Sequence, residues 1–149
     1  MSEIMISLKP CYVEKILSGD KTIELRSRKL NIQNGAMVWI YTTLPKGCIE
    51  AAATIEFIEY SCPTLIWEKY AKDIAITEGE FKKYVNGNDS VSAIKLINVM
   101  KVSAPLSLGL IRSWVENFHP PQFFSHLKSD MKISSLLSRE LLGGCPGRN

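Results

Sequence analysis

Three charged residues, Lys21, Glu24 and Arg26, lie within the six-residue segment KTIELR. If this segment is a strand, Glu24 and Arg26 share one face and the two apolar residues share the other. Lys21 stands at the start of the strand, where a turn can direct its ammonium to either face. An ammonium and a guanidinium bind phosphate or a base edge, and a carboxylate accepts a hydrogen bond from an exocyclic amine. The spacing indicates either a polar cleft with this chemistry or a salt-bridge network that fastens a helix to a sheet.

Two predicted elements precede this segment and position it: a strand and, after the strand, a short helix. Residues 4–9 alternate apolar and polar and predict a strand. Pro10 stands where the first turn of a helix tolerates proline, and apolar residues follow it at helical spacing. Gly19 is the expected C-terminal cap of this helix. The charged segment therefore follows a helix and a tight turn, and residues 21–26 form a second strand.

The rest of the chain alternates extended and helical patterns. Further strands are predicted at residues 36–42, 48–60 and 92–103, and helices after Pro63, from Thr77 to Tyr84 and at residues 110–118. Thr77 with Glu80 three residues later is a capping box. The many β-branched residues and few helices predict an α+β fold, a small barrel decorated by short helices.

The C-terminal part differs in pattern. Pro120-Pro121 breaks the chain, and an apolar stripe at helical spacing follows at Ile133, Leu136, Leu137, Leu141 and Leu142. We expect a folded domain over residues 1–128 and a helical extension over residues 129–149, with residues 145–149 disordered. The extension packs on its own core or forms a contact for a partner or for a weak homodimer.

Composition narrows the classes of protein. The 149 residues carry 18 Lys and Arg against 15 Asp and Glu, a net charge of +3, with the densest basic window at residues 21–29. This local excess suits a phosphate-bearing partner. No apolar run has the length of a membrane span and no secretory signal is visible, so a soluble, cytoplasmic protein is expected.

The cysteines and histidines give no sign of a metal site or of a nucleophile–base pair. Cys11, Cys48, Cys62 and Cys145 include no C-x-x-C pair, and His119 and His126 lie far from the first three. We expect no metal and no cofactor.

Four segments resemble the ASCH (activating signal cointegrator homology) family of the PUA-like superfamily: I-S-L-K-P, S-G-D-K-T-I-E-L-R, W-I-Y-T-T and H-P-P-Q-F-F-S-H-L. The resemblance spans residues 4–127. It implies a mixed barrel of about six strands with a cleft between barrel and helices for RNA or a nucleoside. Lys21, Glu24 and Arg26 match the family's cleft motif.

The resemblance also extends the predicted binding set. Lys9 ends the first strand beside the motif, and Tyr41, Thr42 and Thr43 lie where the family's third strand borders the cleft. Arg28 belongs to the same basic window. Trp39 and Tyr41 share one face of their strand, where they form a stacking surface for bases or pack in the core; core packing is the expected role of Trp39.

One enzymatic branch of the family, the N4-acetylcytidine amidohydrolases, uses a lysine, a threonine and a distant glutamate. Lys21 matches the lysine, but Glu24 stands at the threonine position and Ile74 at the glutamate position. Neither departure preserves the chemistry, since a carboxylate is no hydroxyl nucleophile and isoleucine moves no proton. The remaining substitutes are Thr22 or Thr42 with Asp73 or Glu78, which no spacing favours.

Ribonuclease activity is attributed to other relatives. Lys21 and Arg26 can stabilise charge on a phosphoryl group, and Glu24 is the one visible base. The leading expectation is a regulatory module that binds RNA or a modified nucleoside without catalysis. An amidohydrolase or a ribonuclease using Lys21 and Glu24 is the alternative, and a protein-interaction adaptor is the second alternative.

Overall fold

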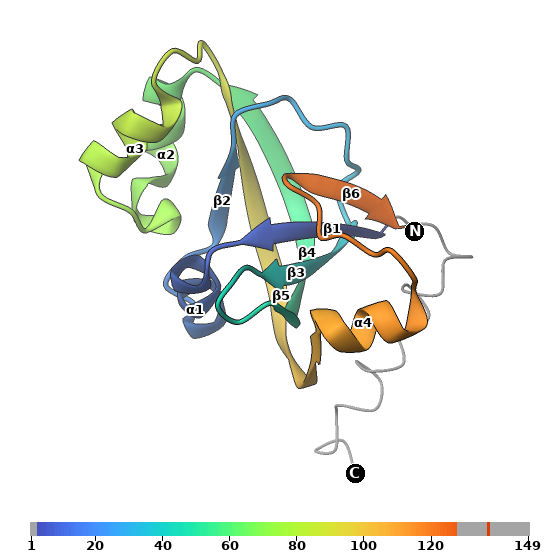
Figure 1. The fold of residues 1–149 in the computed structure, drawn as a ribbon. Coiled ribbons are helices and arrows are strands. Elements are labelled where there is room, and N and C mark those ends of the chain that lie inside the picture. The colour runs from blue at the N-terminus through green and yellow to red at the C-terminus, as the bar shows by residue number, and fades with distance from the viewer. Residues whose placement is uncertain (1–2, 128–136, 138–149) are drawn as a thin grey trace.

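The computed structural model describes residues 3–127 and 137. In chain order, its elements are β1 (Glu3–Leu8), α1 (Pro10–Ser18), β2 (Ile23–Arg26), β3 (Met37–Thr42), β4 (Cys48–Ser61), α2 (Pro63–Ile74), α3 (Glu78–Val85), β5 (Val91–Ser107), α4 (Leu108–Trp114) and β6 (Phe124–Leu127) (Figure 1). Among these residues, no helix has the length and apolar character needed to cross a membrane.

All six strands form one curled, mixed sheet in the order β2-β5-β4-β3-β1-β6. The β1–β3 pair is parallel, and the other four pairs are antiparallel. Short helices decorate the sheet, so the predicted α+β fold with a small mixed barrel of about six strands is confirmed. The described strands form a half-barrel, because β2 and β6 are its two edges and do not pair with each other.

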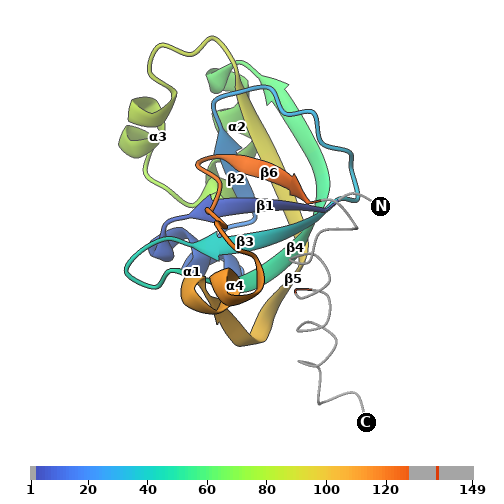
Figure 2. The same cartoon turned by 45° about the vertical axis from the view of Figure 1, so that its right-hand side comes forward.

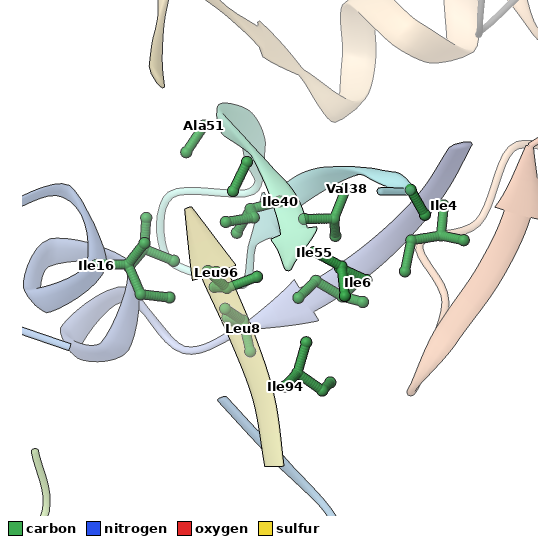
Figure 3. Packing of buried hydrophobic residues seen from close by; sticks show 13 residues of the cluster. Ile4, Ile6, Leu8, Ile16, Val38, Ile40, Ala51, Ile55, Ile94 and Leu96 are labelled. Atoms are coloured by element: carbon green, nitrogen blue, oxygen red, sulfur yellow. The ribbon is translucent and has the colours of Figure 1, made fainter. Parts of the chain in front are cut away.

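The concave side of the sheet holds the main hydrophobic cluster. Figure 3 shows Ile6 and Leu8 of β1 facing Ile55 of β4 and Leu96 of β5, while Ile16 of α1 closes one end. Alternation along β1 produces this arrangement, since its even-numbered residues share one face. The interior is therefore filled with apolar side chains.

Two smaller clusters cover the outside of the sheet. Ile23 and Leu25 of β2 pack under α2 and α3, whereas Trp39 and Tyr41 of β3 belong to a cluster that includes Ile111 of α4. Figure 2 shows α2 and α3 grouped at one end of the sheet and α4 at the other. Trp39 is fully buried, which confirms its expected core role.

Several boundaries differ from the sequence-based expectation. The predicted strand over residues 21–26 begins only at Ile23, because Lys21 and Thr22 lie in the turn after α1. β5 runs to Ser107, where the hydroxyl accepts from the Leu110 amide and starts α4 two residues earlier than predicted. That helix ends at Trp114. Residues 124–127 form β6, which was not predicted and which pairs with the free edge of β1. The predicted C-terminal extension lies outside the described residues apart from Leu137, which is buried in the outer cluster of β3 and α4.

Candidate functional site

The turn between α1 and β2 places Lys21. Gly19 has a φ of 90° and its amide donates to the Ile16 carbonyl, which ends α1. The Lys21 amide then donates to the Lys15 carbonyl at 3.0 Å, and the Thr22 amide donates to the Asp73 carbonyl at 2.9 Å. These backbone bonds fix Lys21 just before β2, between the end of α1 and the end of α2.

Lys21, Glu24 and Arg26 form one buried ionic network. Lys21 and Glu24 are 3% and 4% exposed, and the Lys21 Nζ lies 3.8 Å from the Glu24 Oε1. The other carboxylate oxygen of Glu24 accepts from the Arg26 guanidinium. The Lys21 Nζ also donates to the Ile74 carbonyl at 2.8 Å, where the C-terminal end of α2 favours a cation. The sequence left a salt-bridge network and a polar cleft as alternatives. In the structure, the same three residues form both.

Arg26 bridges the opening of the half-barrel. Its Nη2 donates to the Ser7 carbonyl of β1 at 3.2 Å, and its Nη1 donates to the Leu25 carbonyl of its own strand at 2.9 Å. The Ser7 hydroxyl in turn donates to the Pro121 carbonyl at 2.6 Å and holds the segment that leads into β6. One guanidinium therefore connects β2 to β1 at the place where the sheet does not close.

A cleft of about 280 Å³, the central cleft, lies at this opening. Its walls come from β1, α1, β2, α3 and the segment before β6: Ser7, Leu8, Lys9, Tyr12, Lys21, Glu24, Leu25, Arg26, Ile76, Glu80, Tyr84, Gln122 and Phe123. Three aromatic rings stand around the ionic network. The Lys21 Nζ lies 5.2 Å from the centroid of Tyr12, and the Tyr84 hydroxyl donates to the Leu25 carbonyl at 3.2 Å.

Burial shifts the pKa values of three side chains that line the central cleft. Desolvation lowers the pKa of Lys21, and the Glu24 carboxylate offsets part of that shift. Desolvation raises the pKa of Tyr12 and Tyr84, which keeps both phenols neutral near pH 7. At the rim, the Thr77 backbone amide lowers the pKa of Glu80. The cleft thus offers cations and phenols as donors and Glu24 as an acceptor, with its charges nearly balanced.

The structure brings together four of the eight residues predicted for binding. Lys9, Lys21, Glu24 and Arg26 line the central cleft, and Arg28 lines a neighbouring cleft. The other three, Tyr41, Thr42 and Thr43, are absent from the lining of both clefts. Tyr41 and Thr42 are buried, at 4% and 0% exposure.

Several lining residues were not found from the sequence. Tyr12 has the pattern of an ordinary position in a short helix, and Tyr84 lies 58 residues after Arg26, the last residue of the cleft motif. Phe123 stands in the P-P-Q-F-F segment that helped to identify the family, which was the one available signal. Their convergence depends on the folding of α1, α3 and β6 around β2.

The threonines and acids weighed as substitutes in amidohydrolase chemistry are absent from the lining of both clefts: Thr22, Thr42, Asp73 and Glu78. Ile74 is fully buried, and only its carbonyl faces Lys21. Thr22 accepts from the Lys95 Nζ at 3.0 Å, and Glu78 pairs with Lys82 on the exposed face of α3. Within residues 3–127 and 137, no three His, Cys, Asp or Glu side chains cluster in a way that could hold a metal ion.

The fold and the cleft define a class of small mixed half-barrels with a polar site at the barrel opening. Residues 2–113 match the family described as a domain of unknown function, DUF365. An ASCH domain-containing ribonuclease of Zymomonas mobilis is 30% identical over 139 residues, which is 92% of this chain and 93% of that protein. The chain belongs to the ASCH domain family and has a PUA-like fold.

Solved structures agree with this assignment. The crystal structure of ASCH from Zymomonas mobilis has a TM-score of 0.84 and 29% sequence identity, covering 91% of this chain and 94% of that one. Human THYN1, solved in complex with DNA containing 5-methylcytosine, has a TM-score of 0.58 and 13% identity, covering 94% and 98%. The second likeness concerns the fold.

Proposed function

We propose that this protein is a ribonuclease that binds single-stranded RNA in the central cleft. The observation that carries the proposal is the buried network of Lys21, Glu24 and Arg26 beside three aromatic rings, in a chain 30% identical to an ASCH ribonuclease. Cationic groups and aromatic rings in one cleft suit the phosphates and unstacked bases of a single strand.

The network is better suited to stabilising charge than to removing a proton. Glu24 is paired with both Lys21 and Arg26, so its carboxylate orients the two cations. In RNA cleavage, the 2′-oxygen bonds to phosphorus, the P–O5′ bond breaks, the 2′-hydroxyl proton passes to solvent and the 5′-oxygen gains a proton. Arg26 would stabilise the charged phosphoryl oxygens. Lys21 would supply the proton, because an ammonium with a lowered pKa donates it more readily.

Cleavage of a 5′-labelled single-stranded RNA, with products identified by mass spectrometry, tests this proposal. We expect a cyclic phosphate end from the wild type and no cleavage where a 2′-deoxyribose replaces the ribose at the cleaved position. Lys21→Met should lower kcat by at least about 100-fold. Lys101→Ala, an exposed lysine outside both clefts, is the matched control and should leave the rate unchanged. Equal rates for wild type and Lys21→Met, or no cleavage by the wild type, would contradict the proposal.

The second candidate function is binding of RNA or a modified nucleoside without catalysis, in a regulatory role. The observation that favours it is the pairing of Glu24 with both Lys21 and Arg26, which leaves no unpaired carboxylate in the ionic network. Anisotropy titration of a 2′-O-methyl RNA measures binding apart from cleavage. Tight binding together with no cleavage of the all-ribose strand would select this function.

A further inference from the structure

A second cleft of about 280 Å³, the basic cleft, adjoins the central cleft. It is lined by Arg26, Ser27, Arg28, Lys29, Leu30, Phe123 and Phe124. Arg26 and Phe123 line both clefts and form the wall between them. In Figures 1 and 2, the connection that follows β2 arches above β6. Residues of both segments line the basic cleft.

The two clefts differ in their charges. The lining of the central cleft includes the carboxylates Glu24 and Glu80, whereas the lining of the basic cleft includes three cationic side chains and no acidic one. Arg28 and Lys29 are exposed, and neither takes part in an ion pair of the described residues. Their charge is therefore available to an anionic ligand.

The basic cleft is held in place by the sheet on both sides. The Ser92 hydroxyl, fully buried in β5, donates to the Arg28 carbonyl at 2.6 Å. Leu30 packs against the main hydrophobic cluster. On the other side, Phe124 begins β6 and is paired with Ile6 of β1. Both walls are thus anchored to the core, which gives the cleft a defined shape.

Phe123 and Arg28 form a stacked pair at the mouth of this cleft. The guanidinium carbon of Arg28 lies 4.9 Å from the centroid of the Phe123 ring, and the ring is 46% exposed. A stacked guanidinium keeps its donor edge free for phosphate oxygens, while the ring offers a surface for a base. This combination of aromatic and cationic groups is typical of sites that bind single strands.

We propose that the basic cleft is a second nucleotide subsite, which binds the phosphodiester and base of the nucleotide next to the one in the central cleft. This inference rests on the proposed function and specifies its substrate as a single-stranded oligonucleotide of at least two nucleotides. Each cleft lies just below the range of roughly 300–1,000 Å³ typical of small-molecule sites, which suits one nucleotide apiece. Phe123, standing between them, separates the two bases and so favours an unpaired strand.

The test compares a single nucleotide with an oligomer. Adenosine 5′-monophosphate and a labelled 2′-O-methyl oligoadenylate of eight nucleotides are titrated against wild type and Arg28→Ala/Lys29→Ala at several salt concentrations. We expect the double variant to bind the oligomer on the order of tenfold more weakly at 0.1 M salt and to lower the salt slope by about 1.4. Its affinity for the mononucleotide should be unchanged. Lys72→Ala/Lys101→Ala removes the same charge from exposed positions outside both clefts and should match the wild type.

The outcomes separate this inference from the proposed function. In one outcome, the wild type cleaves RNA and the double variant binds the oligomer as tightly as the wild type. The second subsite is then overturned and the proposed function stands. An equal loss for mononucleotide and oligomer would show damage to the central cleft and would also overturn a separate subsite. Absence of binding to either probe by the wild type would overturn both.

Discussion

The central cleft and the basic cleft have the same volume of about 280 Å³ and share Arg26 and Phe123, yet their charges are organised in opposite ways. In the central cleft, Lys21 and Glu24 are buried and paired. In the basic cleft, Arg28 and Lys29 face solvent. Buried, paired charges select a ligand through hydrogen bonds and shape, whereas solvated cations attract phosphate at longer range and respond to salt. In the proposed function, the central cleft therefore recognises the bound nucleotide, and the basic cleft attracts its phosphates.

The largest expected difference between the clefts concerns stability. Glu24→Ala leaves two cations without their carboxylate and should lower the free energy of unfolding by about 3–5 kcal/mol. Arg28→Ala, at an exposed position of the basic cleft, should change it by less than about 0.5 kcal/mol. Urea denaturation of both variants measures the two values. Similar losses at the two positions would remove the distinction between a buried and a solvated network.

The next effect concerns the shared aromatic wall. Phe123→Ala should weaken binding of a 2′-O-methyl single strand by about 1–3 kcal/mol, because bases stack on exposed rings. The matched control is Trp114→Ala, which removes a ring of α4 that is 51% exposed and lines neither cleft. Anisotropy titrations of both variants make the comparison. Equal losses of affinity would show that exposed aromatic area in general, and not this wall, governs binding.

A smaller effect is expected from the N-terminal cap of α3. This helix contributes Tyr84 and Glu80 to the central cleft and no residue to the basic cleft. The Thr77 hydroxyl accepts from the Glu80 amide at 3.1 Å, and the Glu80 carboxylate accepts from the Thr77 amide at 3.0 Å. Thr77→Ala should lower the free energy of unfolding by about 1 kcal/mol, measured in urea. Mononucleotide affinity should fall, and the salt slope for the oligomer should stay the same. A changed slope would mean that the clefts are not independent.

The smallest effect is a shift in titration. Burial lowers the pKa of Lys21, so its ammonium should lose its proton at a lower pH than an ordinary lysine with a pKa of 10.5. The charge that Lys21 contributes to binding is present below its own pKa and is lost as the pH rises through that value. Its ¹³Cε resonance, assigned with Lys21→Met, reports the midpoint. A midpoint at or above 10.5 would show that the Glu24 carboxylate offsets the whole of the desolvation.

The sequence was informative where a pattern is local. Alternation in residues 4–9 and the Thr77–Glu80 box predicted elements that the structure contains, because strand pleat and helix caps depend on neighbouring residues. The same holds for Lys21, Glu24 and Arg26, which lie within six residues. β6 was missed because a four-residue strand after two prolines carries little pattern, and the free edge of β1 supplies its pairing.

The rest of the candidate site depends on tertiary structure. Alternation placed Tyr41 on one face of β3, but only the curl of the sheet decides which face meets which helices. In the structure, Tyr41 is buried in the cluster that α4 covers. Tyr12, Tyr84 and Phe123 come from three distant segments that meet at β2. Their positions in the cleft result from the packing of α1 and α3 and from the pairing of β6. No spacing in the sequence indicates this arrangement.

The open edges of the sheet have a consequence for self-association. An unpaired edge strand is a template to which another chain can add, and short edges with inward-pointing charges are a recurrent protection against aggregation. β2 and β6 have four residues each, and β2 carries Glu24 and Arg26 at the opening of the half-barrel. A strand from a second molecule that paired there would have to displace the Arg26 bond to Ser7 and expose two buried charges. The same residues that shape the central cleft thus protect the free edge of β2 from pairing with a strand of another molecule.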